Sequence, residues 1–229
     1  QIRMFTVPRA RSYNEDKEDC VGGEWLCAAP KSVAEMSAVA YLFAYNLVGK
    51  VDFPIGIITS NWGGTRIESW MPMKALEDVL SKEQIEHKHT VHSIKPTELY
   101  CAMIAPIKNY TAKGFLWYQG CSNVSSCGTY QNLLTHLVKS WREEFRNPEM
   151  PFYIVEIAPH TYAGINGALL REAQARVAAR TSNCELVVTN DQNQIPGDIH
   201  PPKKWDVAHR LAACALGAHY HKSSAEFRS

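Results

Sequence analysis

Residues 54–65 read PIGIITSNWGGT, an apolar run that passes directly into a polar turn with two adjacent glycines. A short, continuous apolar run bounded by turn residues is typical of a strand that is buried on both faces of a sheet. We therefore predict a strand over Pro54–Thr59. Similar runs predict four further strands, at Ile2–Val7, Lys113–Tyr118, Phe152–Ile157 and Glu185–Thr189.

Helical patterns separate these runs. We predict helices over Ser32–Gly49, Thr129–Arg146, Gly167–Thr181 and Lys203–Tyr220. The helix over 129–146 is the clearest, because its apolar residues fall on one stripe and its charged residues point away. Strands that alternate with helices predict βαβ units and a mainly parallel sheet covered on both sides. No repeat or linker divides the sequence, so we expect residues 1–229 to form a single α/β domain.

The composition excludes some classes of function. The 24 Lys and Arg residues nearly balance the 23 Asp and Glu residues, for a formal net charge of +1. Such a chain has no long-range field to attract a polyanion, so we expect no nucleic acid partner. The longest apolar run, Ala38–Tyr45, is much shorter than the roughly 20 residues that cross a bilayer, so we expect no membrane span.

The cysteine pattern indicates neither a metal site nor a defined set of disulfide bonds. The chain has seven cysteines, with no Cys-x-x-Cys pair, which predicts neither a zinc site nor a complete set of disulfides. Cys20 with Cys27, or Cys121 with Cys127, could pair in an oxidising compartment. Buried free thiols are the alternative.

Polar loops follow three of the predicted strands. They span residues 60–65, 119–123 and 190–201. Ligand sites in open α/β sheets gather at the carboxyl ends of the strands. We therefore expect these three loops, which are far apart in the sequence, to meet at one rim of the sheet and to form the candidate site.

Asp198 and His200 are the candidates for acid–base chemistry. An imidazole is a suitable general base for a hydroxyl nucleophile, and a carboxylate two residues away can hold the ring in one tautomer. Taken alone, an Asp-x-His segment is more often a surface or helix-capping pair. The histidines at His87, His89 and His92 are spaced poorly for metal ligation, so we interpret them as a solvated face and predict no metal site.

Gly63 and Gly64 offer backbone N–H groups that no side chain covers, as an oxyanion requires. The alternative is a tight strand-to-helix connection. Asn123 could add a side-chain amide donor, or it could cap the next element. Ser122 follows a strand, but Val124 stands where a nucleophile elbow needs its second glycine, so we do not assign Ser122 as the nucleophile.

A set of ordered segments carries a resemblance to a known family. They are FTVP (5–8), SAVAY (37–41), PIGI (54–57), SNWGGTRIESW (60–70), LYCAMIAP (99–106), GFLWYQG (114–120), PFY (151–153), LREAQ (170–174) and DIHP (198–201). Together they resemble the sialate O-acetylesterase family of SGNH hydrolases. The resemblance implies a three-layer α/β/α, flavodoxin-like fold. It also implies a carbohydrate O-acetylesterase that hydrolyses acetyl esters on sialic acid or a related sugar, without a metal or other cofactor.

The resemblance also implies roles for particular residues. The family's oxyanion glycine falls on the Gly63-Gly64 pair and its oxyanion asparagine on Asn123. Its catalytic histidine falls on His200, with Asp198 as the acid of a Ser-His-Asp mechanism.

The sequence departs from the family's pattern at the nucleophile. The family's serine lies in a Gly-Gln-Ser-Asn-Met block, upstream of the segment that resembles residues 2–8, and the present sequence has no such block. We therefore expect the domain to be truncated before the nucleophile and to lack an interior strand. That strand would come from upstream residues or from a second polypeptide. Cys121 and Cys101 also replace the family's usual Glu and Asn, which predicts altered hydrogen bonding in the active site.

Two other functions remain open at this point. An esterase that acts on acetylated xylan shares the implied fold and triad. A non-catalytic fragment or sugar-binding remnant would explain the absent serine. The resemblance leaves the compartment open between secreted, periplasmic and lysosomal.

Overall fold

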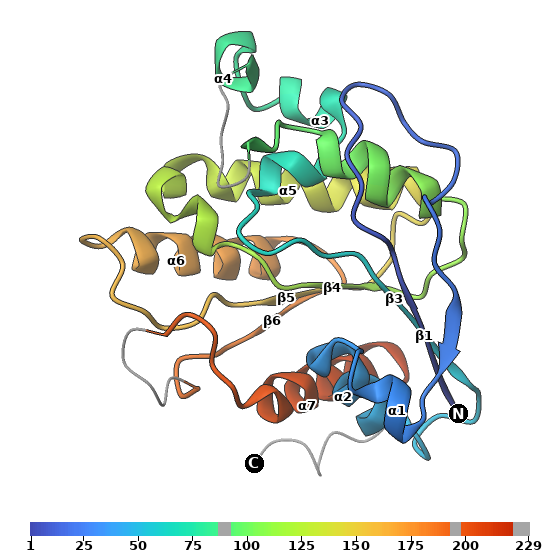
Figure 1. Cartoon of the computed structure of the whole chain (residues 1–229). Coiled ribbons are helices and arrows are strands. Elements are labelled where there is room, and N and C mark those ends of the chain that lie inside the picture. Colours follow the sequence, from blue (N-terminus) through green and yellow to red (C-terminus); the bar gives the residue numbers. More distant parts are fainter. Residues whose placement is uncertain (87–92, 193–197, 222–229) are drawn as a thin grey trace.

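Strands form the middle layer of the computed structural model, which describes residues 1–86, 93–192 and 198–221 (Figure 1). The strands are β1 (Ile2–Thr6), β2 (Trp25–Cys27), β3 (Ile55–Thr59), β4 (Phe115–Trp117), β5 (Phe152–Val155) and β6 (Cys184–Val187). All five predicted strands are present, and each is shorter than predicted by one to three residues. The sequence did not reveal β2, because it has only three residues and all three are exposed.

Helices precede and follow these strands. The α-helices are α1 (Pro30–Val33), α2 (Ala38–Leu47), α3 (Met73–Glu77), α4 (Lys82–Glu86), α5 (Cys127–Glu144), α6 (Asn166–Arg180) and α7 (Lys204–Cys214). Short 3-10 or π-helical segments span Ile67–Trp70, Tyr100–Ile104, Ala105–Ile107, Cys121–Ser126 and Ala215–His219. Within the described ranges, no helix is both long enough and apolar enough to cross a membrane.

Two of the predicted helices were wrong in extent. The single helix predicted over Ser32–Gly49 is divided into α1 and α2, because the side chain of Ser37 accepts a hydrogen bond from the Ala40 N–H and starts a new helix there. The helix predicted over Lys203–Tyr220 is α-helical only as far as Cys214 and continues as a π-helical turn.

The strands form two three-stranded sheets, in the orders β2-β1-β3 and β4-β5-β6. β1 and β3 are parallel, in a register that pairs Ile2 with Ile55 and Thr6 with Thr59. β4, β5 and β6 are parallel to one another, whereas β2 is antiparallel to β1. The prediction of mainly parallel pairing is therefore confirmed, but the strands do not form one continuous sheet.

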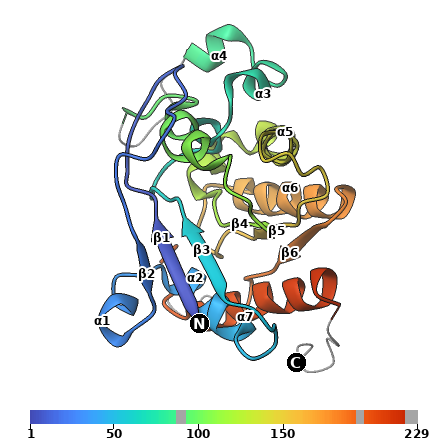
Figure 2. The ribbon, with the colours of Figure 1, turned by 90° about the vertical axis from the view of Figure 1, so that its right-hand side faces the viewer.

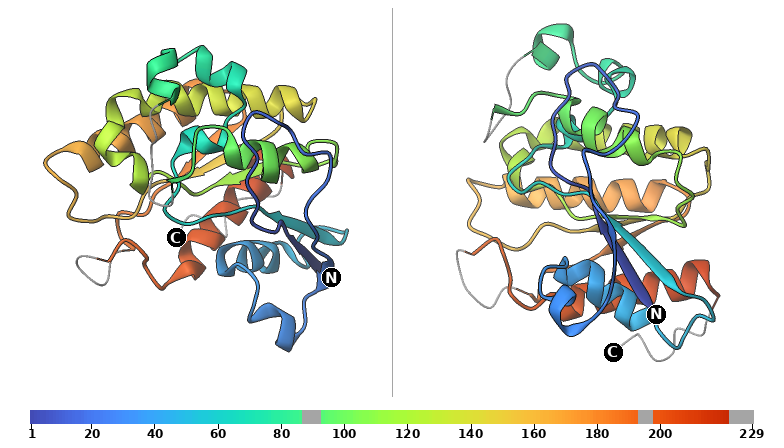
Figure 3. Two further views of the ribbon diagram at one scale, coloured as in Figure 1. Left: turned by 45° about the horizontal axis from the view of Figure 1, so that its top comes forward. Right: turned by 45° about the vertical axis from the view of Figure 1, so that its right-hand side comes forward.

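Helices cover both faces of the strand layer (Figures 1 and 2). On one face α2 and α7 lie side by side, and their apolar side chains form a common core with both sheets. This core includes Ile2, Ile55, Phe43, Ala44, Leu47, Tyr153, Val155, Val187, Val207, Ala208 and Leu211. On the other face α5 and α6 cover β4, β5 and β6 (Figure 3). The predicted three-layer α/β/α arrangement is confirmed.

The strand layer is interrupted between β3 and β4. In the described residues no strand pairing joins these two strands, so each has one unpaired edge. Ile57 and Ile58 of β3 and Phe115 and Leu116 of β4 are only half-buried, although β5 is buried along its whole length. The unpaired edges thus lie between two halves that α2 and α7 connect on one face.

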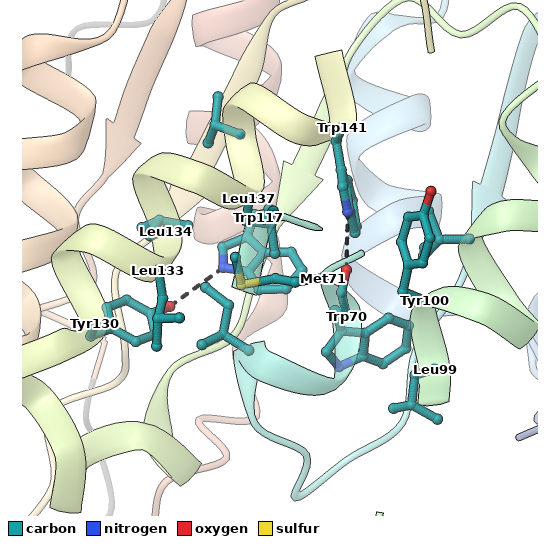
Figure 4. Packing of buried hydrophobic residues seen from close by; sticks show 14 of the residues in the cluster. Trp70, Met71, Leu99, Tyr100, Trp117, Tyr130, Leu133, Leu134, Leu137 and Trp141 are labelled. Carbon is teal, nitrogen blue, oxygen red and sulfur yellow. Dashed lines mark hydrogen bonds between the residues drawn. The ribbon is translucent and has the colours of Figure 1, made fainter. Parts of the chain in front are cut away.

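The apolar stripe of helix α5 is buried against neighbouring hydrophobic side chains, as its sequence pattern predicted (Figure 4). Leu133, Leu134 and Leu137 are fully buried. The indole N–H of Trp141 donates to the Trp70 carbonyl at 3.0 Å. This contact fixes the segment that follows β3 against α5.

Candidate active site

Asn123 lies in the 3-10 segment that precedes α5, and its side chain is fully buried. Its Oδ1 accepts hydrogen bonds from the Ile67 N–H at 2.9 Å and from Nε2 of Gln119 at 2.8 Å. Its Nδ2 donates to Oε2 of Glu68 at 2.8 Å. An amide nitrogen carries two hydrogens, so one N–H of Asn123 is available for a further acceptor.

Gly63 and Gly64 form an exposed turn in the loop that follows β3. Gly64 has a φ of +76°, a backbone conformation that glycine adopts without steric penalty. The Thr65 hydroxyl donates to the Trp62 carbonyl at 2.7 Å and accepts from the Trp70 indole at 2.9 Å, which fixes the turn. No atom lies within 4 Å of the position that a Cβ at Gly63 would occupy, so a ligand can approach the turn closely.

Gln119 and Arg66 join the loops that follow β3 and β4. Nε2 of Gln119 also donates to the Thr65 carbonyl at 3.1 Å, and Arg66 donates to the hydroxyl of Ser126. The Tyr130 hydroxyl donates to Oε1 of Gln119 at 3.0 Å. The Gly63-Gly64 turn and the Asn123 loop therefore meet at one rim, as predicted for two of the three loops.

Asp198 and His200 lie on the loop before α7. Oδ1 of Asp198 accepts from the backbone N–H of His200 at 2.7 Å. It lies 3.6 Å from the ring Nδ1, which is too long for a hydrogen bond, and the imidazole is 82% exposed. The structure thus places the two side chains next to each other. Within the described residues, no hydrogen bond links either of them to Asn123 or to the glycine turn.

Lys204, the first residue of α7, contacts the residue that follows β4. Its ammonium lies over the ring of Tyr118, 5.5 Å from the centroid. Burial lowers the pKa of Lys204, while the carboxylate of Asp198 acts to raise it. The contact with Tyr118 places the start of α7 close to the residue that follows β4.

The two cysteine replacements lie in different surroundings. The thiol of Cys121 is 3.2 Å from the Tyr162 hydroxyl, and burial raises its pKa, so a neutral group stands where the family has a carboxylate. Burial raises the pKa of Cys101 to about 11, and the groups that interact with it are Asp16 and Thr97. The hydrogen-bond partners of Asn123 in the described residues are Ile67, Gln119 and Glu68, so Cys101 is not among them.

The cysteines, one serine and three histidines are the remaining candidates from the sequence. All seven cysteines are free thiols, so neither suggested pair is bonded. Ser122 is half-buried beside Asn123. His87, His89 and His92 lie outside the described residues.

Sequence reasoning missed the polar side chains that support Asn123. Glu68 is buried, and Gln174 is fully buried, with its Nε2 donating to the Gln119 carbonyl at 3.1 Å. The available signal for Glu68 was a carboxylate set between the apolar residues Ile67 and Trp70.

Comparisons with known proteins agree with this architecture. A family model described as carbohydrate esterase, sialic acid-specific acetylesterase, matches residues 20–216. The chain belongs to this family. A curated relative, the sialate O-acetylesterase of Homo sapiens, is 30% identical over 254 residues, covering 99% of this chain and 48% of the relative. The chain thus spans about half the length of the curated relatives that it matches.

Solved structures extend the comparison. A carbohydrate acetylesterase from Xanthomonas citri superposes with a TM-score of 0.86 at 34% identity, over 96% of this chain and 49% of that one. A protein from Arabidopsis thaliana has a TM-score of 0.55 at 19% identity, over 91% of this chain and 79% of that one. The second likeness shows the fold alone. The likeness to the Xanthomonas citri acetylesterase confirms the predicted SGNH-hydrolase fold of this chain.

Proposed function

We propose that the chain forms most of the catalytic domain of a carbohydrate O-acetylesterase that hydrolyses acetyl esters on sialic acid or a related sugar. The observation that carries the proposal is the setting of Asn123. Its amide is fully buried and is held by three hydrogen bonds, with Gln119 joining it to Thr65 next to the Gly63-Gly64 turn. Among the described residues, one of its two N–H groups has no hydrogen-bond partner. Membership of the acetylesterase family and the likeness to the Xanthomonas citri acetylesterase support it.

In the proposed mechanism, a serine hydroxyl attacks the acetyl carbonyl carbon while His200 takes its proton. Asp198 orients the imidazole and stabilises its charged form. The carbonyl electrons move onto oxygen, and the N–H groups of Gly63 or Gly64 and of Asn123 stabilise this oxyanion. When the intermediate collapses, the sugar oxygen leaves with the proton from His200. Water then hydrolyses the acetyl-serine and releases acetate.

The serine would lie on a strand that is not among these 229 residues. The unpaired edges of β3 and β4 support this part of the proposal, because the backbone groups of a strand that is interior to a sheet are normally paired. A parallel strand between them would end at the rim, where the loops of Gly64 and Asn123 meet. It would come from upstream residues or from a second polypeptide.

The first experiment measures acetyl ester hydrolysis by the natural full-length polypeptide. His200→Ala should lower kcat by several orders of magnitude. Asn123→Ala should lower it by roughly 10² to 10³. His136→Ala is the matched control, because His136 is a half-buried histidine on α5 whose ring contacts the backbone of its own helix. A fully active His200→Ala variant would exclude the mechanism.

The second experiment separates the catalytic from the non-catalytic alternative. The 229-residue chain is incubated with a chromogenic acetate ester, with and without a synthetic peptide that carries a strand ending in Gly-Gln-Ser-Asn-Met. The proposal expects turnover only with the peptide, and none when its serine is replaced by alanine. Turnover by the chain alone that Ser122→Ala abolishes would instead identify Ser122 as the nucleophile.

The substrate is tested separately. The full-length polypeptide is compared on O-acetylated sialic acid and on acetylated xylan at equal ester concentration. Preferential release of acetate from sialic acid supports the proposal, whereas preference for xylan would favour the polysaccharide esterase.

A further inference from the structure

Glu68 is a buried carboxylate that the proposed mechanism does not use. It lies in the 3-10 segment Ile67–Trp70 and is only 3% exposed. Its Oε2 accepts from Nδ2 of Asn123 at 2.8 Å. Burying a carboxylate is costly unless it is paired and hydrogen-bonded, so its presence beside Asn123 requires an explanation.

Arg66 supplies the opposite charge. Its Nη2 lies 3.3 Å from Oε1 of Glu68, and its side chain is itself only 14% exposed. Arg66 also donates to the hydroxyl of Ser126, three residues after Asn123. The pair therefore connects the segment after β3 with the loop that carries Asn123, and it leaves no net charge beside the expected oxyanion.

The hydrogen bonds around Asn123 determine which way its amide points. Its Oδ1 faces two N–H donors, from Ile67 and Gln119, and its Nδ2 faces the carboxylate of Glu68. A flipped amide would direct Oδ1 at the carboxylate and Nδ2 at the two donors, and it would lose all three hydrogen bonds. Glu68 is the hydrogen-bond acceptor among these three partners, so the amide nitrogen Nδ2 must point toward Glu68.

We propose that Glu68, neutralised by Arg66, is a positioning residue that orients the amide of Asn123, so that its remaining N–H is directed at the carbonyl oxygen of the reacting ester. This inference rests on the proposed function. An oxyanion donor acts only when it is held at the correct position before the reaction, and small displacements of such a group cost much of its effect.

The test uses the natural full-length polypeptide with a chromogenic acetate ester. Glu68→Ala should lower kcat by about 10- to 100-fold, less than Asn123→Ala, while KM changes less than about twofold. The KM is expected to hold because the N–H of Asn123 strengthens its bond only as charge develops on oxygen. Glu68→Gln has nearly the same shape and keeps an accepting oxygen, so its kcat should lie between those of Glu68→Ala and the parent.

A double-mutant cycle separates positioning from a general structural effect. When Asn123 is already alanine, Glu68→Ala should lower kcat by less than about twofold, because the group that it positions is gone. If the two substitutions instead multiply in their effects, Glu68 acts on something other than Asn123 and the inference is overturned.

Glu98→Ala is the matched control. Glu98 is also a buried carboxylate that pairs with an arginine, Arg11, at 2.8 Å, and it is 8% exposed. It should lose thermal stability as Glu68→Ala does, with kcat within about twofold of the parent. An equal loss of kcat in Glu98→Ala would overturn the inference. A parent that hydrolyses no acetyl ester would refute the proposed function itself, whereas an active parent with a fully active Glu68→Ala refutes only the inference.

Discussion

Asn123 and His200 occupy contrasting environments. Three partners hold the buried amide of Asn123, whereas His200 is largely exposed and, within the part of the chain that the structure describes, is paired with Asp198. The two environments differ because the partners of the two side chains lie in different parts of the polypeptide. The partners of Asn123 lie in the neighbouring segments 65–68 and 119–130, but the partner that we propose for the imidazole is a serine outside these 229 residues.

The thiols give a prediction at the residue scale. Burial raises the pKa of Cys101 to about 11 and that of Cys184 to about 12, whereas Cys27 is exposed. The thiolate is the reactive form, so a raised pKa lowers reactivity at pH 8. A disulfide reagent should label Cys27 rapidly at pH 8, and Cys101 and Cys184 only after unfolding in urea.

Peptide mapping by mass spectrometry measures this labelling. Between pH 8 and pH 10 the labelling of Cys101 in the folded protein should rise with pH, because its thiolate fraction increases about tenfold per pH unit below the pKa. Cys27→Ser identifies the fast site. Equal labelling rates for Cys101 and Cys27 at pH 8 would contradict the buried placement.

At the scale of elements, Gly120 limits how β4 can end. Its φ is +151°, and an added Cβ would lie 2.5 Å from Cγ2 of Ile157 and 3.0 Å from Cδ2 of Leu170. Gly120→Ala should therefore lower the free energy of unfolding by about 2 to 4 kcal/mol, through both backbone strain and overpacking.

Gly128 provides the control for this substitution. It lies in α5, and no atom comes within 4 Å of its would-be Cβ. Gly128→Ala should stabilise the protein by about 0.5 to 1 kcal/mol, because alanine is the better helix former. Urea unfolding measures both variants. A neutral Gly120→Ala would mean that the turn after β4 can relax.

The elements differ in how far the sequence could predict them. The apolar stripe of α5 repeats over five turns, so its position and buried face follow from periodicity. The three exposed residues of β2 carry no such pattern, and their strand exists because β1 offers an edge for pairing. The break between α1 and α2 depends on one capping serine, Ser37, within a continuous helical pattern.

At the scale of the whole molecule, sequence patterns identified the layers and the rim, but not the supporting contacts within it. Strand order positions the loops of Gly64 and Asn123 together, because the ends of parallel strands meet at one edge. Whether a polar side chain such as Glu68 supports that rim depends on contacts between segments about 55 residues apart, which periodicity does not encode.

Hydrogen exchange measures the completeness of the strand layer. In the 229-residue chain, amides of β5, which pairs on both sides, should exchange most slowly, and amides on the unpaired edges of β3 and β4 much faster. Adding the serine-bearing peptide should slow exchange in residues 55–59 and 115–117 and leave residues 152–155 nearly unchanged. Unchanged exchange at both edges would exclude the position proposed for the strand.

The pairing of α2 with α7 has a consequence for the order of folding. Strands β4 to β6 and the helices between them are consecutive in the sequence, so residues 115–187 can assemble through contacts of short sequence separation. The β1–β3 half joins them through contacts such as that between Asn46 and His209, which are 163 positions apart. Docking of α7 on α2 should therefore be a late step in folding. The loop that follows β3 and the loop that follows β4 should reach their final relative positions only after this step.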